Sequence, residues 1–324
     1  MTKHGSWLIT ALLAAVTTGG VEGALAQSTT QGNAAAGAPV LQLSVVPRTA
    51  ALGGAGTASE GIGGIFTNPA AAATVRHLGM QLAGQSLYDG AKAGSIAVGI
   101  RSAIAAFAVG AQYLDMGSVD ELICDGCGGQ GSSTGRKLSA SEQAVSAAAA
   151  VSLARIASLG AAVHYYSTSL ADQSGSAVSF SGGVRAQATE MIAVGASLQY
   201  LGGSAKVGGY TSALPRTARV GAELHPLAGR HVGGGSLQLG LLGDYVSTTG
   251  SPGRVVGGLE VGVLQPSSLG LVGRVGVGSG SGSYATQALS FGGGLRYREL
   301  TLDYAYQGSD VFGSMHRLGV TFER

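Results

Sequence analysis

The chain has 324 residues, a formal net charge of +2 at pH 7 and only 11% charged residues, whereas glycine alone occurs 57 times. So small a net charge, with no basic patch interleaved with aromatic residues, gives no argument for a nucleic-acid-binding protein. After residue 26, no uninterrupted apolar run is long enough for a transmembrane helix. Two classes remain for so apolar a chain, a protein with a large soluble β core and a β-barrel that faces lipid.

Residues 1–26 have the pattern of a secretory signal peptide. A basic start precedes an apolar run over 7–16, and residues 24–26 read Ala-Leu-Ala, an A-x-A cleavage site. The apolar run is too short for a transmembrane anchor, which is the alternative. We therefore expect export and a mature chain that begins at Gln27. Residues 27–46 are expected to form a spacer in the periplasm, disordered in its polar first part.

Residues 47–76 form a segment of small residues that is unsuited to a strand. Its glycines allow positive φ and close backbone approach, and Asn68-Pro69 marks a turn. A segment of this kind needs surrounding walls, which the rest of the chain, 77–324, is expected to provide. The alternative is a mere linker rich in glycine and alanine.

Three motifs follow one another in this segment: Arg48, then Gly53-Gly54-Ala55, then Asn68-Pro69-Ala70. Their order resembles the N-terminal signature of the outer-membrane barrels related to the FadL fatty-acid transporters, and more closely that of the PorV/PorQ-type subgroup. In those families the corresponding segment folds into a hatch inside a barrel of fourteen strands. The resemblance therefore implies that residues 47–76 are a hatch and that the motif residues form it.

Residues 77–324 alternate between apolar and small or polar residues in runs of about ten, the length that crosses a bilayer at a tilt. For example, Leu302 and Tyr304 are separated by Asp303. No helical period explains this alternation. It predicts an all-β fold, a transmembrane antiparallel β-barrel of about 14 strands, with the N-terminal hatch in its lumen. The expected strands are 77–88, 93–101, 103–116, 141–155, 157–169, 175–188, 190–202, 213–225, 235–247, 253–265, 267–278, 285–297, 299–307 and 313–323.

With an even number of strands, the chain enters and leaves the barrel on the same side of the membrane, which in bacterial single-chain barrels is the periplasm. Most expected connections on that side are minimal, while those on the other side, such as 117–140 and 203–212, are longer. The short connection 89–92 and the long one 226–234 break this pattern. We therefore expect the protein in the outer membrane of a Gram-negative-type bacterium.

The inward-facing positions of these strands carry charges of both signs, which would be costly on the lipid face. Three acidic residues of this set, Asp244, Glu260 and Asp303, are candidate lumen partners for Arg48 of the hatch. A partner is expected because a buried, unpaired guanidinium is expensive. The alternative is that the inward charges serve only as salt bridges and polar filling of the lumen.

Cys124 and Cys127 are the only cysteines and form a C-x-x-C pattern. No second cysteine pair or nearby histidine completes a zinc site, and the βαβ context of a thioredoxin-like redox motif is missing. In an oxidising compartment we expect a disulfide in an exposed loop, in preference to free or metal-bound thiols. With no nucleophile elbow, HExxH or paired-carboxylate spacing, the sequence predicts no enzyme, and it predicts no cofactor or metal.

Two functions remain open. The first is a secretion, cargo-binding or structural role of the PorV type, which the chain length favours because it leaves little room for long external ligand-capturing loops. The alternative is a FadL-like transporter or channel for hydrophobic small molecules. The expected partners are outer-membrane lipid, the outer-membrane insertion machinery that would recognise the C-terminal strand, and either secretion partner proteins or a hydrophobic ligand. No nucleic acid is expected.

Overall fold

The computed structural model describes residues 37–87, 90–123, 132–153, 156–227, 231–232, 235–264, 269–279, 289–309 and 313–324. The predicted signal peptide and the predicted disulfide between Cys124 and Cys127 lie outside these ranges. Within the described ranges, no helix has the length and apolar character needed to cross a membrane.

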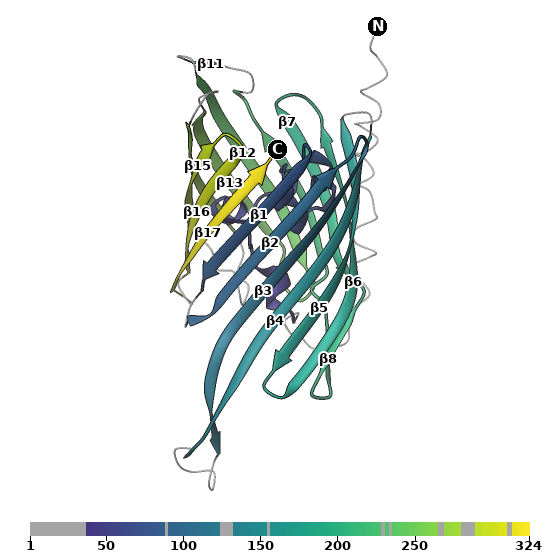
Figure 1. Ribbon diagram of the computed structural model, residues 1–324, viewed down its shortest axis with the longest axis vertical. Helices are drawn as coiled ribbons and strands as arrows, with labels where there is room; N and C mark the ends of the chain where they lie inside the picture. The colour runs from purple at the N-terminus through teal and green to yellow at the C-terminus, as the bar shows by residue number, and fades with distance from the viewer. Residues whose placement is uncertain are drawn as a thin grey trace. The chain divides into compact units, whose positions relative to one another are not determined.

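Fourteen strands of the described residues form a closed antiparallel barrel (Figure 1). They are β1 (Leu78–Ser86), β2 (Lys92–Arg101), β3 (Ala105–Ile123), β4 (Ser132–Leu153), β5 (Ala157–Leu170), β6 (Gln173–Gln187), β7 (Ile192–Leu201), β10 (Thr217–Leu224), β12 (Gly235–Thr248), β13 (Arg254–Leu264), β14 (Leu269–Gly278), β15 (Leu289–Tyr297), β16 (Leu300–Ser309) and β17 (Gly313–Glu323). Successive strands of this set pair with each other, and β1 pairs with β17 to complete the ring. The predicted all-β barrel is confirmed.

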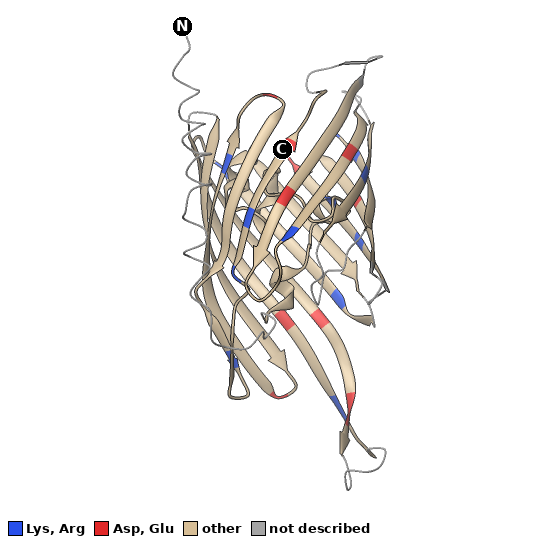
Figure 2. Cartoon of the chain, turned by 180° about the vertical axis from the view of Figure 1, so that it is seen from behind, with Lys and Arg blue, Asp and Glu red and all other residues tan. Residues whose placement is uncertain are grey.

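Side chains alternate between the lumen and the outer surface along the strands. In β16, Asp303 is 6% exposed, whereas its neighbours Leu302 and Tyr304 are 42% and 43% exposed. Figure 2 shows basic and acidic positions interspersed among neighbouring strands. The outer surface is thus apolar and the lumen polar, which is the arrangement required when lipid surrounds a barrel.

The β3–β4 hairpin is longer than the sequence predicts. The loop expected over 117–140 is instead mostly strand, because β3 runs to Ile123 and β4 begins at Ser132. The ladder continues through Val119 and Leu138, with register shifts on either side, and Figure 1 shows this ribbon projecting beyond its neighbours. Alternation is lost here because both faces of a projecting ribbon meet solvent, so no apolar face marks the strands.

Three short strands accompany the barrel. β8 (Ser204–Val207) and β9 (Tyr210–Ala213) pair as a hairpin within the connection expected to be a loop over 203–212. β11 (His231–Val232) pairs with β12 in the long connection after β10.

Residues 37–76, which precede β1, lie inside the barrel (Figure 1). They contain the helices α3 (Pro39–Gln42) and α4 (Pro47–Ala51) and the 3-10 helices η1 (Ile62–Phe66) and η2 (Pro69–Thr74). We call residues 37–76 the lumen segment. It contacts strands on both sides of the ring, from β1 to β6 and from β14 to β17.

The lumen segment begins earlier than the sequence predicts. Residues 37–46 belong to the predicted periplasmic spacer 27–46, yet Val40, Leu41 and Val46 are buried. This apolar stretch is too short to show a period, and Pro39 starts only about one turn of helix. Its burial depends on the wall around it, which the sequence pattern does not show.

Candidate functional site

The lumen segment fits because the wall lacks side chains where the two backbones come closest. A Cβ on Gly276 of β14 would lie 2.1 Å from the backbone nitrogen of Gly53. A Cβ on Gly160 of β5 would lie 2.4 Å from the backbone nitrogen of Ala70. Both distances are far shorter than a carbon atom allows, so glycine is required at these wall positions.

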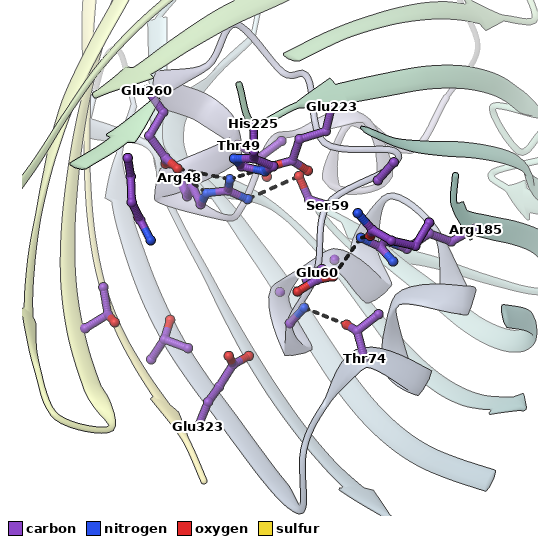
Figure 3. Close-up of a pocket in the computed structure, with 18 of the residues that line it drawn as sticks. Arg48, Thr49, Ser59, Glu60, Thr74, Arg185, Glu223, His225, Glu260 and Glu323 are labelled. Atoms are coloured by element: carbon purple, nitrogen blue, oxygen red, sulfur yellow. Dashed lines mark hydrogen bonds and ion pairs between the residues drawn. The ribbon is translucent and has the colours of Figure 1, made fainter. Parts of the chain in front are cut away.

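Arg48, in α4, joins two strands of the wall (Figure 3). Its Nε lies 3.0 Å from Glu260 Oε2 on β13, and its Nη2 lies 2.9 Å from Glu223 Oε1 on β10. The third nitrogen, Nη1, donates to Ser59 Oγ at 3.1 Å, within the lumen segment itself. Charge-assisted hydrogen bonds to both strands therefore fix the position of α4 in the lumen.

The ion pairs continue along the wall beyond Arg48. Glu260 Oε2 also accepts from Arg274 Nε at 2.6 Å, and Arg274 Nη1 donates to Asp303 Oδ1 at 2.6 Å. Of the three carboxylates predicted as partners of Arg48, Glu260 is the one that bonds to it in the described part of the chain. Asp303 belongs to the same network through Arg274.

Asp244 of β12 holds a different part of the lumen segment. Its Oδ2 accepts hydrogen bonds from Gly56 N at 2.9 Å, from Thr57 N at 3.0 Å and from Thr57 Oγ1 at 2.6 Å. Arg219 Nη2 donates to the same oxygen at 3.0 Å and to Gly54 O at 2.6 Å. Asp244 is 3% exposed, so these donors replace the water that the carboxylate has lost. It anchors a backbone turn and not Arg48.

The Asn-Pro-Ala turn is a third point of attachment. Asn68 Nδ2 donates to Thr57 O and to Val184 O of β6, both at 2.9 Å. Asn68 Oδ1 accepts from Ala70 N at 3.0 Å, which caps η2 where Pro69 begins it. One buried side chain thus connects two turns of the lumen segment to the wall through backbone groups.

The Gly-Gly-Ala element forms the turn after α4. Gly53 and Gly54 have φ angles of 71° and 100°, in the region that favours glycine. Gly53 N donates to Ser290 Oγ of β15 at 3.1 Å. Ala55 is fully buried in a small apolar cluster with side chains of β12 and β13.

Several partners were not identified from the sequence as contacts of the hatch. Arg185 Nε donates to Ala58 O at 2.7 Å, and its Nη2 pairs with Glu60 at 2.8 Å. Arg185 and Glu223 both occupy inward-facing positions in the alternating pattern of their strands. This pattern is the sequence signal that could have identified them as contacts of the hatch. Thr57 is an ordinary polar residue of a Gly-rich stretch and carried no such signal.

A cavity of about 1460 Å³ lies beside the lumen segment, at the end of the barrel where β17 ends. We call it the vestibule. Its lining has charges of both signs, and Figure 3 shows Arg48 between Glu223 and Glu260, with Glu60 close to Arg185. In the part of the chain that the structure describes, no group of three or more His, Cys, Asp or Glu residues is placed to hold a metal ion.

An apolar cluster surrounds α3 further along the lumen, and we call it the α3 cluster. Val40 and Leu41 of α3 belong to it, and Val40 N donates to the buried Glu142 at 2.9 Å. Its other members include Leu87, Leu114, Tyr166, Tyr200, Leu214 and Met315. The lumen therefore has an apolar region at α3 and a charged region at the vestibule.

His225, directly after β10, makes the vestibule network sensitive to pH. Its Nε2 lies 3.0 Å from Glu223 Oε1, and this hydrogen bond raises the pKa of His225 above its usual 6.5. Burial and the charge of Arg48 oppose the rise in pKa, and the charge of Glu260 adds to it. Because the folded pKa is the higher one, the stabilisation is fully present below the unfolded pKa and is lost as pH rises through the folded value.

We expect the thermal midpoint of the wild type to fall more between pH 6 and pH 8 than that of His225→Gln, as followed by circular dichroism in detergent. The difference should correspond to less than about 1 kcal/mol, since the side chain is 35% exposed. Parallel pH profiles of the two proteins would show that this histidine does not contribute.

Comparisons with known proteins bear on the fold. No protein-family model matches the chain, and no curated protein matches it. Solved structures do match. The toluene transporter TbuX of Ralstonia pickettii has a TM-score of 0.56 and 13% identity over 86% of this chain and 97% of its own. A Pseudomonas aeruginosa FadL homologue has a TM-score of 0.55 and 11% identity, and the match covers 90% of this chain and 100% of that one.

The toluene transporter TodX of P. putida matches with a TM-score of 0.55 and 12% identity over 85% of this chain and 97% of its own. At such low identity the likeness concerns the fold, and it covers almost the full length of each neighbour. Together with the apolar outer surface and charged lumen, it identifies the architecture. The chain has the fold of the FadL-type outer-membrane transporters and is a transmembrane β-barrel of the Gram-negative outer membrane.

Proposed function

We propose that the protein is an outer-membrane channel for hydrophobic small molecules, closed by its lumen segment. The observation that carries this proposal is the α3 cluster, an apolar region inside a lumen that elsewhere holds many buried charges. A lumen that passes only polar solutes needs no such region, whereas apolar side chains are what a hydrophobic ligand requires. The toluene transporters with the same fold support the proposal.

The order of the two regions suits uptake from outside the cell. β1 begins and β17 ends at the vestibule, and in barrels with an even strand number this end faces the periplasm. The α3 cluster includes Leu87 and Ala91, which flank the β1–β2 connection at the opposite end. A hydrophobic compound would reach the α3 cluster first and would leave through the vestibule after the lumen segment has moved.

The comparisons favour transport over the secretion or cargo-binding role. Two of the three neighbours described above are toluene transporters and the third is a FadL homologue. The resemblance of the hatch motifs fits both roles and does not choose between them. None of these neighbours is described as an enzyme, which supports a function without catalysis.

Uptake of radiolabelled toluene by cells that express the protein tests the proposal. Leu214→Gln places an amide in the α3 cluster, in the segment between β9 and β10 and outside the barrel strands. Toluene uptake should fall roughly tenfold, because about 1.4 kcal/mol of apolar contact corresponds to a factor of ten.

Leu227→Gln is the matched control, since Leu227 lines the vestibule and not the α3 cluster. It should leave toluene uptake near the wild-type rate. Wild-type uptake no faster than that of cells without the protein, at equal amounts of folded barrel, would refute the proposed function.

A further inference from the structure

The β8–β9 hairpin lies in the mouth of the barrel, at the end opposite the vestibule. It belongs to the connection between β7 and β10, and Figure 1 shows β8 beside the ends of β5 and β6, far from the C-terminus. Ala205 of β8 is 4% exposed and belongs to the α3 cluster, as does Leu214 directly after β9. The hairpin therefore covers part of this cluster from the outer end of the lumen.

The hairpin fills the space between the inner face of β6 and the start of the lumen segment. Gly175 occupies an inward-facing position of β6, like the buried Ala177. A Cβ on Gly175 would lie 2.6 Å from the backbone oxygen of Lys206, so β8 lies directly on this face. On the other side, a Cβ on Gly37 would lie 2.5 Å from Ser212 Oγ of β9. The hairpin thus obstructs the mouth on the β6 side of α3.

Few interactions hold the hairpin in this position. β8 and β9 bond to each other, but within the described residues no hydrogen bond or ion pair joins residues 204–213 to the barrel strands or to the lumen segment. All four residues of β9 are exposed. Segments with few buried apolar contacts and few hydrogen bonds to the rest of a protein open locally at a low cost in free energy. Because the hairpin is a separate sheet, it can leave β6 without breaking the ladder of the barrel.

Two glycines at the base of the hairpin give it a hinge. The β6–β7 ladder ends at Leu201, opposite Phe180, and Gly202 and Gly203 follow with φ angles of 74° and 81°. Leu214 N donates to Gly203 O at 3.3 Å, so the two chain ends of the hairpin meet at a narrow base. Glycine changes φ and ψ at little steric cost, which lets a segment that is held at one base turn as a unit.

We infer that the β8–β9 hairpin is a gate at the outer mouth, which swings away from β6 about Gly202 and Gly203 and uncovers the α3 cluster. The inference rests on the proposed function and deepens it, because it assigns the entry step to an element other than the lumen segment. The two ends of the route are then closed separately, by the hairpin at the outer mouth and by the lumen segment towards the vestibule. A hydrophobic compound enters when the hairpin is open, while α3 and the wall stay in place to receive it.

A disulfide between the hairpin and the lumen segment tests whether the gate must move. A Cβ on Gly37 would lie 3.4 Å from Ser212 Cβ, close to the about 3.5–4.5 Å found in disulfides, so Gly37→Cys with Ser212→Cys can form one. Cys124 and Cys127 are replaced by serine in this background. Toluene uptake should fall at least about tenfold on oxidation and recover on reduction, because only the reduced hairpin can open. Ser212→Cys alone, treated with the same oxidant, is the control and should keep its uptake rate.

Thiol labelling on intact cells reports the gate without reference to transport. Ala177→Cys places a thiol in the α3 cluster, on the inner face of β6 two residues from Gly175. We expect a membrane-impermeant maleimide to label it, and the oxidised disulfide to slow this labelling at least about tenfold. Ala162→Cys is the matched control, because Ala162 is also 8% exposed but belongs to a separate apolar cluster around η1 and η2. It should stay protected whether the hairpin is locked or free.

Excision of the hairpin supplies a second variant that does not depend on the disulfide. Residues 204–213 are replaced by Asn-Gly, a two-residue turn that joins chain ends already adjacent at Gly203 and Leu214. Ala177→Cys should then be labelled at least about tenfold faster than with the hairpin intact. Equal labelling rates with intact, locked and excised hairpins would overturn the inference. A disulfide that slows toluene uptake without slowing labelling would also overturn it, since it would act through the lumen segment. A wild type that takes up no toluene refutes the proposed channel alone, because the labelling rates still report the gate.

Discussion

Deletion of residues 37–73 is expected to turn a closed barrel into an open pore. The lumen segment contacts strands on both sides of the ring and places its backbone against the wall at Gly160 and Gly276. Nothing in the fourteen strands depends on it for main-chain pairing, because each strand bonds to its two neighbours. The truncated protein should therefore insert and close, with a water-filled lumen lined by its inward charges.

Planar-bilayer recordings measure this effect directly. The wild type should be silent or nearly so, and the truncated barrel should conduct continuously at the same protein concentration. Heat-modifiable migration on gels checks that the barrel has folded. Deletion of 118–138 is a suitable control, because it shortens the β3–β4 ribbon and leaves the lumen segment in place. A folded but silent truncated barrel would mean that the lumen segment is not a plug.

The sequence predicts the barrel well because lipid and lumen impose opposite demands on alternate residues. In β16, Leu302 and Tyr304 face outward and Asp303 faces inward, and the same rule marks every strand that crosses the bilayer. Outside the bilayer, no lipid requires apolar residues on one face of a strand, so the alternation is not expected there. The ribbon beyond Asp115 and the β8–β9 hairpin have solvent or other protein around them, so their strands left no period-two signal.

The attachment of the lumen segment was less predictable from the sequence. The alternation along each strand shows which charged residues point inward. The height of each charge along the barrel axis depends on the stagger between strands, which the sequence does not display. Asp244, Glu260 and Asp303 were therefore equivalent candidates, although only Glu260 lies level with Arg48 and bonds to it in the described chain. Glu223 also occupies an inward-facing position and is the second partner of Arg48.

Arg48→Ala is expected to loosen the lumen segment more than any other single substitution in it. The change leaves Glu223 and Glu260 buried after removing the guanidinium that joins them. Breaking a buried ion pair costs about 3–5 kcal/mol, and we take about 2 kcal/mol because the Arg48 side chain is 25% exposed. The population of the displaced lumen segment should rise roughly 30-fold.

Hydrogen exchange at the amides of residues 47–76 measures this population, and brief openings in planar bilayers give a second readout. Arg48→Lys should fall between wild type and Arg48→Ala, because an ammonium cannot bind both carboxylates with the fork geometry of a guanidinium. Arg101→Ala is the control, since Arg101 lines the same vestibule without touching the lumen segment through any hydrogen bond in the described residues.

A double mutant distinguishes loss of the bridge from general damage to α4. If Arg48→Ala acts by leaving Glu223 uncompensated, then adding Glu223→Gln should remove part of the penalty and slow the exchange again. His225 is the remaining partner of Glu223, so the rescue should be larger at high pH, where the imidazole is neutral and cannot compensate the carboxylate in the single mutant. Purely additive effects at every pH would show that Arg48 holds the lumen segment by packing and not by its bridge between β10 and β13.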